Sequence, residues 1–187
     1  YAVIPYMGYA RQDRQFLSGE IVTMSIVAKM LQAAGAKKIV VVDIHSKIAL
    51  NHFKIPKESV SAVPELAKYF KKMKLKNALV VSPDMGGALR AKKFAALLNT
   101  DFIALKKSRD RKTGKVLIQS SKVDVHGKDL ILVDDIISTG GSVIKATQFL
   151  KRQKCKRVFV ACTHGLFIGD AERKIKKAGA SQIISTN

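Results

Sequence analysis

Short apolar runs recur along the chain, and polar or small residues follow each of them. The clearest runs are rich in Val, Ile and Leu and span Ile39 to Val42, Ala78 to Ser82 and Leu130 to Val133. Runs of this length are typical of strands that are buried on both faces of a parallel sheet. Further strands are predicted at Tyr1 to Pro5, Asp101 to Leu105, Lys115 to Gln119, Arg157 to Cys162 and Gln182 to Ser185.

Helical segments are predicted between these strands. Apolar residues from Ile21 to Leu31 recur at helical spacing, with Ser18 as the predicted N-cap and Gly35 ending the helix. Strand and helix alternate along the whole chain, which predicts an α/β fold with parallel sheets flanked by helices. The predicted helices span Glu20 to Ala34, Glu65 to Met73, Ala88 to Leu98, Ser142 to Gln153 and Gly169 to Ala178.

The chain is predicted to form two lobes. The stretch from Ile55 to Pro64 contains two prolines and no clear periodicity, so it marks a boundary, with lobes at 1–60 and 61–187. The sequence opens directly on a strand, with no initiator Met and no polar lead-in. We therefore expect the chain to be the middle of a longer protein, with the first lobe incomplete.

Composition excludes several classes of protein. Hydrophobic residues make up 47% and charged residues 26% of the chain, which is typical of a globular protein and not of a disordered one. No apolar run is long enough to cross a bilayer, and no signal peptide begins the chain, so no membrane partner is expected. Cys155 and Cys162 lack metal-type spacing and are interpreted as buried thiols in a reducing cytoplasm.

The charge is strongly positive, at +20 from 34 Lys and Arg against 14 Asp and Glu. Such a balance raises nucleic acid as a partner. The lysines are spread along the chain, however, and no aromatic-rich RNA-binding signature accompanies them. A lysine-rich surface and polyphosphate substrates explain the charge, and nucleic acid is not expected as the main partner.

One stretch, Leu130 to Val143, combines a buried strand, two acids and a run of small residues. In open α/β sheets, ligands bind at the carboxyl ends of strands, where Asp134 and Asp135 are predicted to lie. Glycines allow close backbone approach, and the N–H groups and hydroxyls at a helix start can cradle a phosphate. The acids suit ribose hydroxyls or a hydrated Mg²⁺. This order predicts a sugar-phosphate site.

Three other segments carry candidate chemistry. Asp84 and the glycines after it repeat the strand–acid–glycine–helix pattern, and Asp84 could bind a metal ion. Arg11 to Arg14 form a charged cluster after the first strand, where arginines can hold polyphosphate. Asp43 and His45 would share one face of an extended chain. A lone His or a charged loop is more often structural, so these residues alone leave both interpretations open.

The chain resembles the ribose-phosphate pyrophosphokinase (PRPP synthetase) family in four segments that occur in the family's order. Its last segment by itself also resembles the PRPP-binding loop of type I phosphoribosyltransferases. The resemblance implies two phosphoribosyltransferase-like lobes, an ATP side in the first and a ribose 5-phosphate side in the second. The four segments are YMGYARQDR (6–14), VDIH (42–45), SPDMGG (82–87) and LILVDDIISTGG (130–141).

The resemblance also implies an activity and roles for individual residues. The family transfers the diphosphoryl group of ATP to the C1 hydroxyl of ribose 5-phosphate, giving PRPP and AMP, in the cytoplasm as a homo-oligomer. Lys107 and Arg109 would stabilise the transferring group, although Lys106, Arg111 and Lys112 are neighbouring candidates. The remaining implied roles are ATP binding by Arg11, Gln12, Asp13 and Arg14, Mg²⁺ binding by His45 and Asp84, and ribose 5-phosphate binding by Asp134, Asp135, Ser138, Thr139, Gly140, Gly141 and Ser142.

Three alternative functions fit parts of the sequence. A PRPP-consuming phosphoribosyltransferase needs the phosphate loop but not the ARQDR or VDIH segments. A non-catalytic PRPP-synthetase-like regulatory subunit would have lost ligand residues, whereas each position that can be checked is filled. A PRPP-sensing nucleic-acid regulator would fit the charge, but no helix-turn-helix pattern is evident.

Overall fold

The chain folds into two compact units, residues 1–62 and residues 63–187. The computed structural model describes residues 1–109, 116–119 and 124–186. Each unit has its own buried apolar core: one cluster in the first unit and two in the second. The units are therefore described separately, and the assignment of one lobe to ATP and the other to ribose 5-phosphate stays a prediction.

Unit 1 is a three-stranded parallel sheet in the order β1-β2-β3, with one long and one short helix. Alternate residues of β2, Ile39 and Val41, are fully buried together with Met24 and Ala28 of α1. This period of two places one face of the sheet against the helix. The elements are β1 (Ala2–Ile4), α1 (Thr23–Ala33), β2 (Ile39–Val42), α2 (Lys47–Asn51) and β3 (Lys57–Val60).

Three details of unit 1 differ from the sequence prediction. Helix α1 begins at Thr23 after Val22, so Ser18 does not cap it. The carboxylate of Glu20 instead accepts hydrogen bonds from the N–H groups of Phe16 and Leu17, which holds that segment in a turn. The helix α2 and the strand β3 were not predicted. β3 reads KESV and is exposed at every position, so it carries no hydrophobic pattern.

Unit 2 contains a five-stranded, all-parallel sheet in the order β10-β9-β8-β4-β5. The predicted α/β class with parallel sheets flanked by helices is therefore confirmed. The strands of this sheet are β4 (Ala78–Ser82), β5 (Asp101–Ala104), β8 (Asp129–Ile137), β9 (Arg157–Gly165) and β10 (Gln182–Ser185). The helices are α3 (Val63–Lys72), the short 3-10 turn η1 (Met85–Gly87), α4 (Ala88–Leu98), α5 (Gly141–Arg152) and α6 (Ala171–Lys177).

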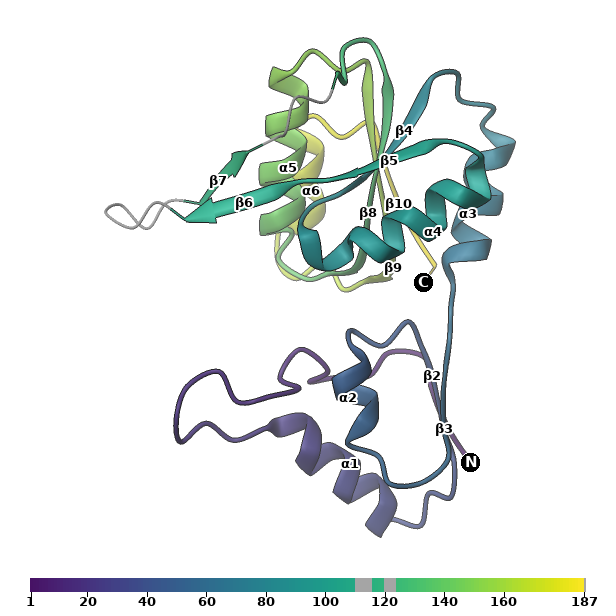
Figure 1. The fold of residues 1–187 in the computed structure, drawn as a ribbon, viewed down its shortest axis with the longest axis vertical. Coiled ribbons are helices and arrows are strands. Elements are labelled where there is room, and N and C mark those ends of the chain that lie inside the picture. The colour runs from purple at the N-terminus through teal and green to yellow at the C-terminus, as the bar shows by residue number, and fades with distance from the viewer. Residues whose placement is uncertain (110–115, 120–123, 187) are drawn as a thin grey trace. The chain divides into compact units, whose positions relative to one another are not determined.

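Helices cover both faces of this sheet. Figure 1 shows α5 and α6 on one face and α3 and α4 on the other. The core follows the same division, because Leu130 and Leu132 of β8 pack with α5 and α6, whereas Ile131 and Val133 pack with α3 and α4. A strand with helices on both faces is apolar at every position, which explains the continuous LILV run.

Strand β8 is longer than predicted. It was expected to end at Val133, but it runs on to Ile137, paired with β9 from Asp129 opposite Arg157 to Ile137 opposite Gly165. Asp134 and Asp135 thus lie inside the strand and not after it. Because β4 pairs only with Ala78 opposite Asp129 to Val81 opposite Leu132, the carboxylates still lie beyond the end of that neighbour.

A separate antiparallel pair precedes β8. β6 (Lys106–Arg109) pairs with β7 (Val116–Gln119), with Arg109 opposite Val116. The sequence predicted β7 but assigned Lys106 to Gly114 to a loop, so the strand β6 is a correction. Within the described residues, no helix is long and apolar enough to cross a membrane.

Candidate functional site

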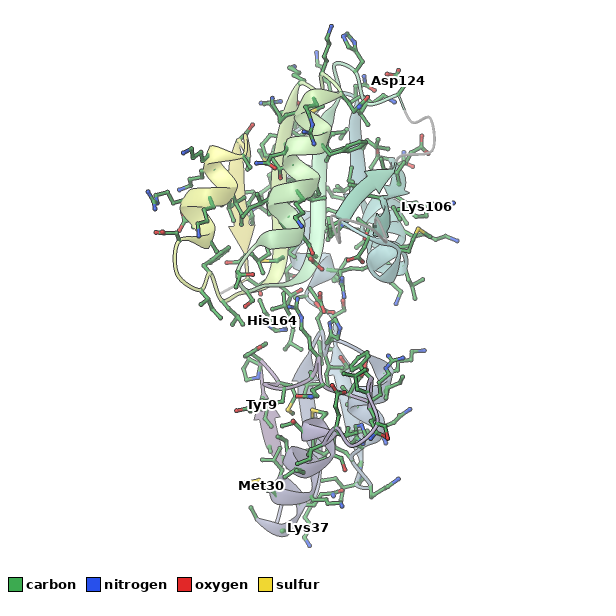
Figure 2. The ribbon with its side chains drawn as sticks, turned by 90° about the vertical axis from the view of Figure 1, so that its left-hand side faces the viewer. Tyr9, Met30, Lys37, Lys106, Asp124 and His164 are labelled. Carbon is green, nitrogen blue, oxygen red and sulfur yellow. The ribbon has the colours of Figure 1, made fainter. Side chains whose placement is uncertain are left out.

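The candidate sugar-phosphate groups of unit 2 meet at the carboxyl edge of the sheet. Asp134 and Asp135 come from β8, and the next neighbouring strand, β4, ends at Ser82. Figure 2 shows His164, near the end of β9, at this edge. Parallel strands bring their carboxyl ends to one side of a sheet, where an open α/β fold binds ligands. The structure therefore brings these predicted residues to one edge.

Arg90 completes the acid pair, and no role had been predicted for it. It lies in the first turns of α4, with its guanidinium nitrogens 3.6 Å from Asp134 Oδ1 and 3.5 Å from Asp135 Oδ2. These distances allow electrostatic attraction but exceed those of a good hydrogen bond. One cation thus faces two carboxylates. The sequence signal was the arginine three residues after the SPDMGG turn.

Burial and the neighbouring Asp135 raise the pKa of Asp134 to about 7. Burial is the larger cause, and the charge of Asp135 adds to it, whereas Arg90 acts in the opposite direction. The Oδ1 of Asp134 also accepts a hydrogen bond from the N–H of Asp135 at 2.9 Å. Near neutral pH, this pair can therefore exchange a proton and accept hydrogen bonds from hydroxyl groups.

The turn after β4 is tightly built around Asp84. Its Oδ1 caps η1 by accepting from the N–H of Gly87 at 3.3 Å, and Ser82 Oγ donates to the Asp84 carbonyl at 2.7 Å. A Cβ on Gly87 would lie 2.5 Å from Ser82 Oγ, so any larger residue there would force Ser82 or the turn to move. The predicted acid–glycine turn thus holds a carboxylate at the same edge as Asp134 and Asp135.

The segment from Ser138 to Ser142 forms the turn from β8 into α5. Gly140 precedes the helix with a φ of 75°, and a Cβ there would come 3.0 Å from Ile175 Cδ1 of α6. Helix α5 lies entirely within the described residues and has no side-chain cap at its N-terminus. An uncapped helix start with small residues suits an anion, because its N–H groups point outward. Thr139, Gly141 and Ser142 are exposed at this turn.

In unit 1, Asp13 lies at the centre of a hydrogen-bond network. It is only 2% exposed, and its carboxylate accepts bonds from Arg14 Nε at 3.0 Å and from Ser46 Oγ. The bond from Arg14 is the main reason why the pKa of Asp13 is lowered. The backbone carbonyl of Asp13 lies 2.7 Å from His52 Nε2. Asp13 was predicted to hold ATP, which stays a prediction, and in the structure its carboxylate bonds Arg14 and Ser46.

This network joins the ARQDR and VDIH segments inside unit 1. Ser46 follows His45 directly, and its Oγ caps α2 by accepting from the N–H of Ala49 at 3.0 Å. Gln12 in turn anchors the start of α1, because its Oε1 accepts from Thr23 Oγ1 at 3.1 Å. Arg11 and His45 lie exposed beside these anchors. Ser46 was not recognised from the sequence, although a Ser before a helix is a common cap.

Asp43 and His45 do not share a face as expected. The backbone turns at Asp43, whose φ is 38°, so the chain is no longer extended there. The Asp43 carboxylate instead accepts from Ser61 Oγ and from the N–H of Ala62, each at 2.9 Å. Asp43 thus stabilises the last residues of unit 1. His45 stays the candidate metal ligand of this segment.

For Lys107 and Arg109 the structure describes the backbone in β6 but not the side chains, and Arg111 and Lys112 lie outside the described residues. Cys162 is buried in β9, and burial raises the pKa of its thiol to about 12. A thiol with that pKa is not a nucleophile near neutral pH.

Among the described residues, no group of three or more His, Cys, Asp or Glu side chains could hold a metal ion by itself. Mg²⁺ is normally bound by one or two carboxylates together with substrate phosphates and waters, so it does not require such a group. The carboxylate of Asp84 fits an oxygen-liganded ion of this kind. His45 offers a nitrogen, which Mg²⁺ favours less.

Comparisons with known proteins cover the whole chain. Residues 53–185 match the phosphoribosyl transferase domain family, and residues 1–35 match the N-terminal domain of ribose phosphate pyrophosphokinase. The ribose-phosphate pyrophosphokinase of Sulfurisphaera tokodaii is 37% identical over 187 residues, which is 100% of this chain and 64% of that protein.

Solved structures give the same picture. The phosphoribosylpyrophosphate synthetase of Mycobacterium smegmatis has a TM-score of 0.88 and 32% identity, covering 99% of this chain and 60% of that one. A purine phosphoribosyltransferase of Pyrococcus horikoshii has a TM-score of 0.52 and 15% identity over 81% of this chain and 89% of that one, a likeness of fold alone. The chain thus spans about three fifths of the length of the longer relatives.

Proposed function

The chain belongs to the phosphoribosyl transferase domain family, and from this premise we propose that it acts as a ribose-phosphate diphosphokinase. The reaction transfers the diphosphoryl group of ATP to the C1 hydroxyl of ribose 5-phosphate and yields PRPP and AMP. The observation that carries the proposal is the continuous likeness to a phosphoribosylpyrophosphate synthetase across both units, at a TM-score of 0.88. The purine phosphoribosyltransferase reaches only 0.52.

The sugar-phosphate is held by unit 2. Asp134 and Asp135 accept hydrogen bonds from the ribose hydroxyls, and Arg90 balances part of their charge. The 5-phosphate binds at the uncapped start of α5 between Ser138 and Ser142. These contacts fix the sugar so that its C1 hydroxyl can attack the β-phosphorus of ATP. Positioning of this kind can supply a large share of a phosphoryl-transfer rate.

The nucleotide is held by unit 1. Arg11 is exposed and offers a forked donor to phosphate oxygens. Gln12 and Asp13 act through the chain they anchor, since their side chains already bond Thr23, Arg14 and Ser46. Arg14 is half exposed at its side chain and can contact ATP while it keeps its bond to Asp13. Lys107 and Arg109 stabilise the charge that develops on the transferred group.

The reaction implies Mg²⁺, for which each unit offers one candidate ligand, His45 in unit 1 and Asp84 in unit 2, and the nucleotide phosphates would supply others. When bound, the ion neutralises phosphate charge and lowers the repulsion that the attacking hydroxyl meets. The proposal also includes a cellular location and an oligomeric state. The two buried free thiols fit a reducing cytoplasm, and the likeness to the synthetases supports a homo-oligomer.

The proposal is tested by following AMP release from ATP, Mg²⁺ and ribose 5-phosphate. We expect AMP only when the sugar is present, and a loss on the order of 10²–10³ in rate for Asp135→Ala. Asp124→Ala, which removes a carboxylate at the opposite edge of unit 2, is the control and keeps the native rate. Sugar-independent AMP, or equal rates in the two variants, would contradict the proposal.

A further inference from the structure

A cavity of about 620 Å³ opens at the amino edge of the sheet of unit 2. Its walls come from the end of α3, the start of β4, the connection between α4 and β5, and Lys128 just before β8. Figure 2 shows Asp124, in the segment that leads to β8, at this edge, opposite to the edge of His164. The five residues of β4 separate the two edges by about 13 Å. The cavity is therefore distinct from the Asp134–Asp135 edge.

Positive charge dominates the lining of this cavity. Lys71, Lys74 and Lys128 contribute three ammonium groups, and Asp101 contributes one carboxylate, which leaves 3 − 1 = +2. Within the described part of the chain, none of the three lysines takes part in an ion pair. Lys71 and Lys74 are exposed and Lys128 is half-buried. Three cations are thus gathered in one hollow with little local compensation.

Helix stability explains only part of this arrangement. Lys71 lies in the last turn of α3, where a cation favours the helix macrodipole. Lys74 comes after the helix has ended, and Lys128 belongs to no helix. Lys128 also lies beside another lysine of the chain, because its carbonyl accepts a hydrogen bond from the N–H of Lys156 at 2.9 Å. The lysines at this edge are therefore not confined to α3.

The cavity also has uncharged polar side chains that can form hydrogen bonds with a ligand. Asn77 and Thr100 add polar atoms to its wall. Its floor reaches the core of unit 2 through Ile131 of β8, so its shape rests on packed strands. The volume lies within the range of small-molecule sites, about 300–1,000 Å³.

We infer that this cavity is a second anion site, which takes a small anion with two or three linked phosphate groups. Lysine ammoniums act as point charges on flexible stems, which suits a phosphate chain with freely rotating groups. The net charge of +2 in the cavity is matched better by a chain of linked phosphates than by a ligand with a single carboxylate. The inference does not depend on the proposed diphosphokinase activity, because no residue of the cavity is assigned to that reaction.

The test is an NMR titration of the full chain with tripolyphosphate in the absence of Mg²⁺. Amide shifts at Asn77, Thr100 and Lys128 report on the cavity, and shifts at residues 138–142 report separately on the loop before α5. We expect saturable shifts at the cavity amides. The triple variant K71Q/K74Q/K128Q weakens binding there at least tenfold, whereas the matched variant K92Q/K93Q/K174Q, which removes three exposed lysines elsewhere, changes it less than twofold.

Three outcomes would overturn the inference: shifts confined to residues 138–142, equal weakening by both triple variants, or equal shifts with sulfate at the same ionic strength. Equal weakening by both variants would mean that the overall positive charge, and not the cavity, attracts the anion. Equal shifts with sulfate would mean that the cavity does not select linked phosphate groups. The titration of the native chain gives a result even if a variant fails to fold. A failure of the diphosphokinase proposal would appear in AMP release and leave the cavity shifts unchanged.

Discussion

The carboxyl group of Asp134 lies where burial works against its charge. Its pKa of about 7 exceeds the ordinary value of 3.8, so between these values the folded protein keeps a proton that the unfolded chain releases. The free energy of unfolding must therefore fall as the pH rises from about 4 to 7. Several pKa units correspond to a cost on the order of a few kcal/mol for the ionised group.

Asp134→Asn removes this cost and should stabilise the protein at pH 8, with little effect at pH 4. Urea unfolding midpoints at the two pH values measure the effect, because the native chain loses stability across this range and the variant loses less. The same variant should bind ribose 5-phosphate more weakly, since an amide accepts fewer hydrogen bonds than a carboxylate. An unchanged pH slope in Asp134→Asn would contradict the raised pKa.

Gly87 lies in the tight turn that holds Asp84 at the site edge, and a side chain at this position would crowd Ser82. Gly87→Ala would place a methyl group 2.5 Å from Ser82 Oγ, the atom that holds the carbonyl of Asp84. Overpacking of this kind costs about 1–3 kcal/mol. Gly141→Ala is the matched control, because its Cβ would have nothing within 4 Å. Thermal unfolding should separate the two variants, and equal midpoints would show that the turn adjusts freely.

At the scale of elements, hydrophobic pattern predicted the strands and helices that are buried. β2, β4, β10 and α4 have the bounds that the sequence predicted. The pattern failed where exposure removes it, as in β3, or where the element is short, as in α2. It also failed at the end of β8, because two acids suggested a loop although Ile136 and Ile137 beyond them are buried in the sheet.

The site was predicted unevenly for a related reason. Motif spacing identified Asp84, Asp134, Asp135 and the turn before α5, which the fold brings to one edge. Contacts between distant segments could not be seen in the sequence. Arg90 meets the acid pair only because α4 begins beside β8, and Asp13 meets Ser46 only through the folding of unit 1. The sequence therefore revealed the chemical groups but not the residues that position them.

The hydrogen-bond network around Asp13 in unit 1 holds the start of α2, so weakening this network should affect the helix. Asp13→Asn would weaken the bonds to Arg14 and Ser46 and so loosen the start of α2. Because the pKa of Asp13 is lowered, its stabilising effect is present above pH 4 and is lost as the pH falls below that. We expect a cost of about 1–3 kcal/mol at pH 7. Glu58→Gln, which removes a carboxylate from a surface pair with Lys38, is the control and costs less than about 0.5 kcal/mol.

Chemical denaturation of both variants at pH 7 and pH 3 measures this difference. The gap between Asp13→Asn and the native chain should shrink at pH 3, which lies below the ordinary aspartate pKa of 3.8, because the unfolded native chain then binds the proton that the folded carboxylate resists. A gap that stays the same at both pH values would mean that the network acts through shape and not through charge.

At the scale of the whole molecule, each unit has its own core, so local damage should stay local. Phe53 is fully buried in unit 1 and Phe94 is fully buried in unit 2. Phe53→Leu should increase hydrogen exchange in β2 without affecting β8, and Phe94→Leu should do the reverse. Mass spectrometry of exchanged peptides gives the answer, and loss of protection in both units from one substitution would contradict separate cores.

The central claim is transfer of a diphosphoryl group to ribose 5-phosphate. Its most direct measurement uses ATP labelled with ³²P at the β-phosphorus in one sample and at the γ-phosphorus in another, with chromatography of the products. We predict that both labels enter the sugar product to the same extent, with one AMP formed for each sugar. Transfer of the γ label alone with release of ADP, or no transfer of either label, would contradict the account.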